Sequence, residues 1–141
     1  MIKDTFEQYA AQNKVKVQVI QKEGDPYPHL GITIKGNSNT WTSYAIPMED
    51  EHLLVFYTLS EIKVPEEKRD RVAGLLQKLN FELKLSGFYM NPVSGEIIVR
   101  SVQYMYGTEE EQKKVLDMLV QSCGIVMEHY YPEIVKEVFQ A

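Results

Sequence analysis

Apolar and polar residues alternate with a period of two along three segments in the first half of the chain, and a fourth segment is apolar on both of its faces. In the first segment, Val15, Val17 and Val19 alternate with lysine and glutamine. β-Branched residues at this period are typical of strands with one buried face. Stretches rich in proline and glycine, which cannot continue a ladder, separate the segments. The pattern therefore predicts a meander of four strands, at residues 14–22, 29–36, 40–46 and 52–62.

Three further segments carry apolar residues at helical spacing, at residues 2–12, 65–80 and 108–139. Pro65 suits the first turn of the second helix, where its missing N–H costs nothing. Thr108 followed by Glu111 matches a capping box, which marks the start of the last helix. Pro132 lies within the last helix, and we expect it to kink or restart that helix.

The sequence after the second helix predicts a β-hairpin. Two alternating strands flank the turn NPVSG at residues 91–95. We place Met90 opposite Glu96, so that Phe88 pairs with Ile98. Because side chains alternate along a strand, this register decides which face of the sheet each residue occupies.

The order of elements is therefore α-β-β-β(-β)-α-β-β-α, within one domain that spans residues 1–141. This order favours an α+β fold, in which an antiparallel sheet has helices packed on one face. The segment at residues 52–62 is apolar on both faces, which is typical of a central strand.

Charge and composition exclude several classes of partner. The net charge is −5, the pI is about 5.2 and the acidity is even, so we expect no binding to nucleic acid. The single cysteine, Cys123, cannot form an internal disulfide. No apolar run reaches the roughly 20 residues that a membrane helix needs. We therefore expect a cytoplasmic protein that does not bind membranes.

Residues of the types that carry chemistry are present but scattered. His29, His52 and His129 do not have the spacing of metal ligands. Cys123 lies on an apolar helix stripe, as a core cysteine does. The acidic triplet at residues 109–111 suits the first turn of a helix. We therefore predict no catalytic residue, no metal site and no cofactor, in a protein that is not an enzyme.

A mixed apolar and basic surface is the candidate binding site. Aromatic residues opposite the more apolar strand faces, together with neighbouring cations, would form a half-exposed surface for a peptide or a partner subunit. Ordinary cross-strand pairing explains the same residues equally well. The candidate residues are Phe56, Lys84, Phe88, Ile98, Arg100 and Tyr104.

Motifs around the predicted hairpin resemble the bacterial YbjN family. They are Leu79-Asn80 at the helix end, Gly87 followed by Phe88, the turn at residues 91–95, and Arg100 in the next strand. The resemblance extends over residues 15–138. The family is similar in fold to type III secretion chaperones. The resemblance therefore implies an α-β-β-β-α-β-β-α core, peptide binding without catalysis, and homodimers. This core has one meander strand fewer than the pattern predicts, which leaves open whether residues 29–36 or a neighbouring segment form a full strand of the sheet.

The sequence leaves three functions open. We favour a non-catalytic, chaperone-like or regulatory protein that binds a peptide segment or protein client. The second is a small-molecule binder or an enzyme with an unrecognised site, which would need a pocket with converging ionisable groups. The third is a structural homodimer without a client, formed through the wide apolar face of residues 115–131.

Overall fold

The computed structural model describes residues 1–140. The helices are α1 (Ile2–Gln12), α2 (Arg69–Glu82) and α3 (Glu109–Phe139), with short 3-10 helices η1 (Glu49–Glu51) and η2 (Glu66–Lys68). The strands are β1 (Gln18–Ile20), β2 (His29–Lys35), β3 (Thr40–Met48), β4 (Leu53–Lys63), β5 (Gly87–Met90) and β6 (Glu96–Tyr104). Within the described residues, none of these helices has both the length and the apolar character needed to cross a bilayer.

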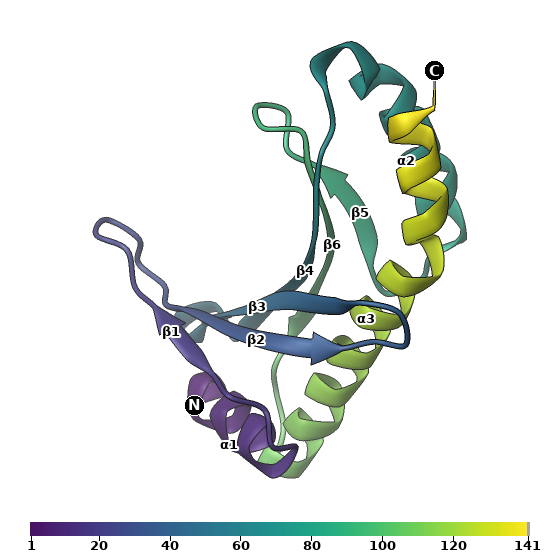
Figure 1. Ribbon diagram of the computed structural model, residues 1–141. Helices are drawn as coiled ribbons and strands as arrows, with labels where there is room; N and C mark the ends of the chain where they lie inside the picture. The colour runs from purple at the N-terminus through teal and green to yellow at the C-terminus, as the bar shows by residue number, and fades with distance from the viewer. Residues whose placement is uncertain (141) are drawn as a thin grey trace.

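The six strands form one antiparallel sheet in the order β1-β2-β3-β4-β6-β5. The predicted meander of four strands is confirmed, although its first strand covers only Gln18–Ile20 and not the predicted residues 14–22. β2 is a full strand that pairs with both β1 and β3. β4 is central, as its two apolar faces indicated, because it lies between β3 and β6. The three helices lie on one side of the sheet (Figure 1). The predicted α+β fold is therefore confirmed.

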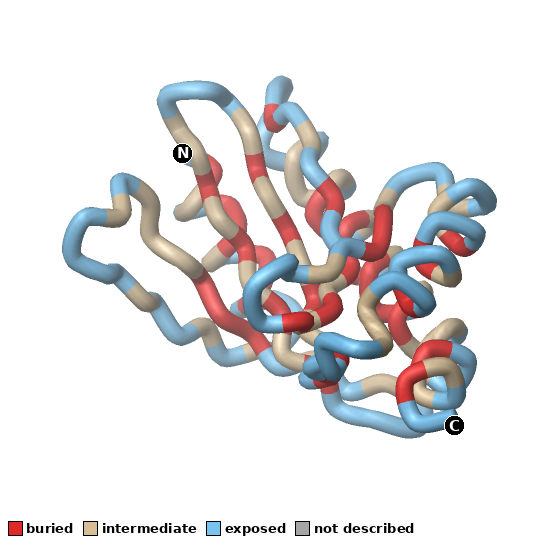
Figure 2. The backbone as a smooth tube through the Cα atoms, turned by 90° about the horizontal axis from the view of Figure 1, so that it is seen from above, coloured by how far each residue is buried: buried red, intermediate tan, exposed pale blue. Residues whose placement is uncertain are grey.

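The two faces of the sheet differ in burial. Along the strands, buried residues alternate with half-buried ones (Figure 2). The buried set faces the helices and forms the core together with their apolar stripes. One row of paired residues on this side is at most 4% exposed: Leu30, Ala45, Phe56 and Ser101.

Small hydroxyl residues occupy part of the helix-facing side of β4. Thr58 and Ser60 are both buried. The Thr58 and Ser43 hydroxyls share a hydrogen bond of 2.8 Å, and the Ser60 hydroxyl donates to the Ile97 carbonyl at 2.6 Å. Because each hydroxyl has a partner, its burial carries little penalty. A strand face that contains serine and threonine therefore belongs to the core here.

The β5–β6 hairpin has a register one residue away from the predicted one. Phe88 lies opposite Val99, and Ile98 pairs with Tyr89 instead. The turn sets this register. The Asn91 N–H donates to the Glu96 carbonyl at 2.8 Å, and Gly95 within the turn adopts a φ of 77°, a left-handed conformation that glycine adopts without steric cost. The slip of one residue turns Phe88 toward the helices and Tyr89 toward the opposite face.

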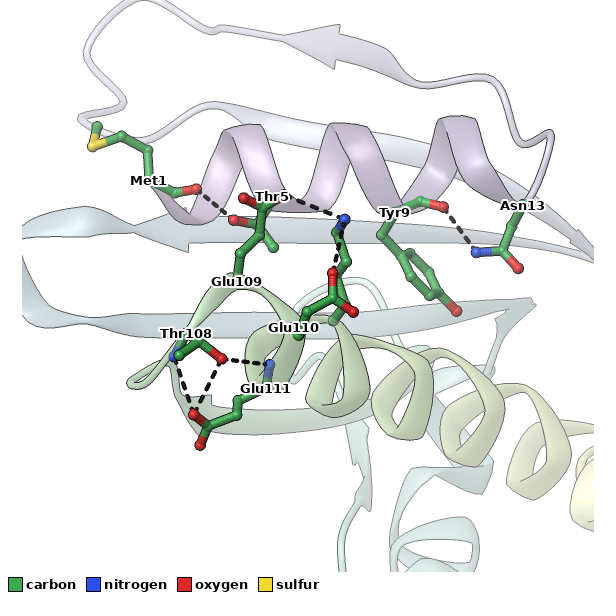
Figure 3. A network of polar contacts seen from close by, with 9 residues as sticks. Met1, Thr5, Tyr9, Asn13, Thr108, Glu109, Glu110 and Glu111 are labelled. Carbon is green, nitrogen blue, oxygen red and sulfur yellow. Dashed lines mark hydrogen bonds and ion pairs between the residues drawn. The ribbon is translucent and has the colours of Figure 1, made fainter.

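The three predicted helices are present, with differences at their ends. α2 continues to Glu82, two residues beyond its predicted end, so that Phe81 lies on the helix surface and is 92% exposed. The capping box is confirmed, since the Glu111 N–H donates to the Thr108 hydroxyl at 3.2 Å (Figure 3). α3 runs through Pro132 as one helix, so the helix does not restart there.

α1 packs against α3 although the two helices are distant in the sequence. The Tyr9 hydroxyl donates to a carboxylate oxygen of Asp117 at 2.8 Å, across 108 positions of sequence. Figure 3 shows Tyr9 projecting from α1 on the side of α3. Burial and the Asp117 carboxylate both raise the pKa of Tyr9. α1 is therefore held in place by the last helix of the chain.

Two carboxylates fasten helices to the sheet region. Glu49 accepts from the backbone N–H of Ile2 at 2.8 Å and of Lys3 at 3.0 Å, and so caps α1 from another element. Glu128 of α3 accepts from the Asn39 N–H at 3.0 Å and the Trp41 indole at 2.9 Å. These contacts hold α1 and α3 on one side of the sheet and leave the other side free.

Candidate binding surface

The side of the sheet away from the helices is one surface that crosses all six strands, and we call it the open face. One row of paired residues runs across it from β1 to β5: Gln18, Gly31, Tyr44, Tyr57, Arg100 and Gly87. The neighbouring rows add half-buried or exposed apolar residues: Ile46, Val55, Leu59, Ile98 and Val102. The open face therefore combines aromatic, aliphatic and basic groups.

Tyr44 and Tyr57 stack at the centre of the open face. Their ring centroids are 5.5 Å apart, with an interplanar angle of 30°. Gly31 makes room for the pair, because a Cβ atom at this position would lie 3.0 Å from the Tyr44 ring. Burial raises the pKa of the Tyr57 hydroxyl, and the neighbouring Tyr44 raises it further. Tyr57 therefore stays protonated at neutral pH.

Arg100 lies in the same row, and its guanidinium stacks on Tyr89. The Arg100 Cζ atom is 4.2 Å from the centroid of the ring, which is a cation–π contact. Gly87, opposite Arg100, leaves space for the ring, since a Cβ atom there would lie 3.3 Å from it. Within residues 1–140, Arg100 makes no ion pair. The stack thus fixes an uncompensated positive charge on the open face.

The open face contains a hollow of about 570 Å³. Its lining extends from Ile20 in β1 to Tyr89 in β5, so the sheet curves around it. A depression of about 340 Å³ lies at the β5 edge and is lined in part by Lys84. Arg100 and Tyr89 line both recesses. Arg100 therefore stands between a hollow whose lining includes three tyrosines and a smaller depression lined in part by Lys84.

A ladder of three exposed rings continues the open face beyond Val102. Tyr104 stacks on Tyr106 at 6.0 Å, and Tyr106 stacks on His52 at 5.0 Å. Tyr104 and Tyr106 are 67% and 62% exposed. Leu53, which pairs with Tyr104, connects the ladder to the rest of the surface. Exposed aromatic groups gathered in this way are typical of protein interaction sites.

The two edges of the sheet offer little free backbone to a partner strand. β1 has 3 residues and β5 has 4. At β5, the Asn80 side chain donates to the Phe88 carbonyl at 2.9 Å and accepts from the Phe88 N–H at 2.7 Å. Asn80 thus occupies backbone groups that an added strand would need. The geometry favours binding through side chains of the open face over strand addition.

Residues that carry chemistry in other proteins have structural roles here. Burial raises the pKa of the Cys123 thiol to about 12, which makes it a poor nucleophile at neutral pH. Residues 109–111 form the first turn of α3, and His29 pairs with Asp25 at 3.0 Å. Nowhere in residues 1–140 do three His, Cys, Asp or Glu side chains gather as a metal site would require.

Comparison with known proteins supplies the family. The sequence profile of YbjN, described as "Putative bacterial sensory transduction regulator", matches residues 3–136. The chain belongs to the YbjN family. It is similar to a solved structure described as "Crystal structure of YbjN, a putative transcription regulator from E. coli", with a TM-score of 0.61 and 11% identity over 94% of this chain and 95% of the other. None of the curated proteins compared with the chain matches it.

Four of the six predicted site residues of this YbjN-family chain lie on or beside the open face. Ile98, Arg100 and Tyr104 project from β6 on that side. Lys84 precedes β5 and lines the smaller depression together with Arg100. Arg100 therefore shares one recess with Lys84 and the other with Ile98, while Tyr104 belongs to the aromatic ladder. A role of these residues in binding stays a prediction.

Phe56 and Phe88 do not lie on the open face, so the expectation that they do is wrong. Phe56 is 0% exposed and Phe88 is 2% exposed, both beneath the helices. For Phe88, the cause is the register slip in the hairpin. For Phe56, the cause is the pair of buried hydroxyl residues, Thr58 and Ser60, which made the core face of β4 look like the more polar one.

Three tyrosines of the open face were missed from sequence: Tyr44, Tyr57 and Tyr89. The available signal was a glycine within a strand, which often marks the close approach of another group. Gly31 and Gly87 each have a tyrosine ring beside them, from Tyr44 and Tyr89 respectively. Gly31 pairs with Tyr44, and Gly87 lies two residues before Tyr89. In both cases the strand glycine marks the place where a tyrosine ring lies close to the sheet.

The wide apolar face of α3 at residues 115–131 is covered within a single YbjN-family chain. Leu116, Leu119 and Met127 are at most 1% exposed. Of the large apolar residues in this range, Ile125 alone is mostly exposed, at 63%. The observation that suggested a homodimer through this face is therefore explained by the sheet and the other helices. Dimerisation itself stays a prediction.

Proposed function

We propose that this YbjN-family chain is a non-catalytic regulatory protein that binds an extended segment of a partner protein on its open face. The observation that carries the proposal is the open face itself, which is hollowed and rich in tyrosine. Tyrosine and arginine dominate binding hot spots, and Tyr57, Tyr89 and Arg100 gather at the hollow. The family description as a regulator supports the proposal, because regulators act by engaging partners.

The shape of the surface supports an extended ligand. The hollow is lined from β1 to β5, so a segment that follows it contacts most of the sheet. The short edge strands and the Asn80 contact leave side-chain recognition as the available mode. Because strand pairing already fixes the open face, little ordering of the protein opposes binding.

Selection from a random peptide display library tests this proposal. The purified chain is compared with Ile98→Glu, which places a charge on the open face, and with Lys78→Gln, an exposed change on α2 that serves as the control. We expect enriched peptides to bind the wild type and Lys78→Gln equally. Binding to Ile98→Glu should be at least about tenfold weaker, as for loss of a hot spot.

Two results would contradict the proposal. One is the absence of any enriched peptide, or enriched peptides that bind all three proteins equally. The other is a dimer in light scattering that Ile98→Glu dissociates, since a second copy of the chain would then cover the open face.

A small-molecule binder is the second candidate, because a hollow of about 570 Å³ falls within the size range of small-ligand sites. A thermal-shift screen with a metabolite collection tests it. Stabilisation of the wild type that is absent in Ile98→Glu would favour this candidate over the peptide.

A further inference from the structure

We infer that Arg100 anchors a carboxylate of the bound segment, while an apolar side chain of the same segment fills the neighbouring hollow. The inference rests on the proposed function and adds the chemistry of its ligand, an acidic peptide with an apolar residue close to its Asp or Glu. Arg100 is placed for this role because it lines both recesses of the open face.

The guanidinium of Arg100 is held ready for a ligand. Its stack on Tyr89, at 4.2 Å, restricts a side chain that would otherwise be flexible. Tyr89 is itself seated over Gly87, where the absence of a Cβ atom allows the ring to lie close to the strand. A guanidinium fixed by its face keeps its N–H edge free, and that edge matches the two oxygens of a carboxylate.

The surrounding charges favour an anion at this point. The whole chain has a net charge of −5, yet Arg100 has no carboxylate partner within residues 1–140. Lys84 lines the same depression and adds a second positive charge. On the hollow side, the lining also contains Lys22, Glu96 and His29, which is paired with Asp25, besides three tyrosines. An acidic ligand thus compensates a charge that the protein leaves unpaired.

The hollow beside Arg100 suits an apolar group. Leu59 and Ile98 pair across β4 and β6, and both line the hollow with Tyr57. A side chain placed there removes apolar surface from water, which drives association. Arg100 lies two residues from Ile98 on the same face, so one short peptide reaches both groups. The ligand therefore carries its acidic and apolar groups close together.

The experiment repeats the peptide selection with Arg100→Gln, Arg100→Lys and Arg100→Glu, and with Lys78→Gln as the control. For the wild type and the control we expect Asp or Glu to be enriched beside an apolar residue. Arg100→Gln should lose that enrichment, and Arg100→Glu should enrich Lys or Arg instead. Arg100→Lys should keep part of it, because lysine retains the charge without the planar fork. Thermal melts check that each variant is folded. If Arg100→Glu does not fold, the comparison of the wild type with Arg100→Gln still tests the inference.

Affinities of a matched peptide pair complete the test. The best acidic peptide and its Glu→Gln twin are titrated against the wild type and Arg100→Gln. The twin should bind the wild type about tenfold more weakly, and the two peptides should bind Arg100→Gln equally. Enriched peptides without an acidic residue, or acidic enrichment that survives in Arg100→Gln, would overturn the inference and leave the proposed function intact. A wild-type selection that enriches nothing would overturn both.

Discussion

The side-chain amide of Asn80 pairs with both backbone groups of Phe88, at 2.9 Å and 2.7 Å, in the way that a neighbouring strand would. This contact joins the end of α2 to the edge of the sheet. It also fixes the position of Phe88, whose ring is 2% exposed and lies in an edge-to-face arrangement with Tyr130 at 6.0 Å. One amide therefore closes the β5 edge and positions part of the core.

Replacing Asn80 by alanine should destabilise the fold. Two hydrogen bonds to backbone groups are lost, at about 1 kcal/mol each, and the groups left unpaired add to the cost. We expect the free energy of unfolding to fall by about 2–3 kcal/mol in urea denaturation. Gln77→Ala, an exposed change on the same helix, should leave it within about 0.5 kcal/mol. Equal stability of the two variants would show that the Asn80 contact is dispensable.

Phe56 and Tyr57 are neighbours on opposite faces of β4, and their alanine variants should behave differently. Phe56 is fully buried, so Phe56→Ala should cost about 3–5 kcal/mol. Tyr57 is half-buried on the open face, so Tyr57→Ala should cost about 1–2 kcal/mol and should weaken binding of the selected peptides instead. Urea denaturation and peptide titration measure the two effects. A larger stability loss for Tyr57→Ala would reverse the assignment of the faces.

The fold was predictable because its signals are local and repeated. The alternation in residues 40–46 and the Thr108–Glu111 capping pattern each specify an element without reference to the rest of the chain. The faces were less predictable, because they depend on contacts between elements. Thr58 is a polar residue, yet its hydroxyl shares a hydrogen bond with Ser43 on the adjacent strand β3, and the side chain is part of the core.

The candidate site was only partly predictable for a related reason. A shift of one residue in the β5–β6 register exchanges Phe88 for Tyr89 on the open face, and nothing within the strand itself fixes that choice. The turn that does fix it depends on the left-handed conformation at Gly95. Arg100 was identified correctly as lying beside the open face, whereas its stacking on Tyr89 requires the true register.

Glu128 connects α3 to β3 through the indole of Trp41, and the fluorescence of this residue gives a spectroscopic test. Trp41 is the only tryptophan of the chain, and its indole donates to Glu128 at 2.9 Å. Glu128→Ala should lower the free energy of unfolding by about 1–3 kcal/mol and move the Trp41 emission to longer wavelength, because the indole loses its partner and meets water. Glu128→Gln, which keeps an acceptor oxygen, should show a smaller effect.

Glu133→Ala is the matched control for this variant, since Glu133 is exposed on the same helix. We expect its emission spectrum and stability to equal those of the wild type. An unchanged spectrum in Glu128→Ala would mean that Trp41 is held by its contact with Tyr131 alone, whose ring centroid is 5.0 Å away.

The buried Cys123 predicts a loss of stability at alkaline pH. Burial raises the pKa of this thiol from 9 to about 12 in the folded chain, so between these values the unfolded chain has lost a proton that the folded chain keeps. The contribution of the buried thiol to the free energy of unfolding is thus retained below pH 9. It falls as the pH rises toward 12, by at most about 1.4 kcal/mol per pH unit.

Urea denaturation of the wild type and Cys123→Ala at several values between pH 8 and about pH 10.5 measures this slope, in the range where a raised thiol pKa matters. The alanine variant should be less stable overall, yet its stability should decline less steeply with pH. The two proteins differ only at position 123, so the difference between their two slopes isolates the thiol. Parallel slopes would indicate that Cys123 is accessible to water.

The contact between α1 and α3 affects how the chain is made. Ile2 and Phe6 are at most 4% exposed in the finished protein, and Tyr9 reaches Asp117 across 108 positions of sequence. At ordinary translation speeds, the ribosome needs roughly 5 to 20 s to add that many residues. Throughout this interval α1 lacks its contact with α3, so part of its apolar stripe is open to factors that bind near the ribosomal exit tunnel. α3, which the ribosome adds well after α1, is one of the elements that cover the apolar stripe of α1.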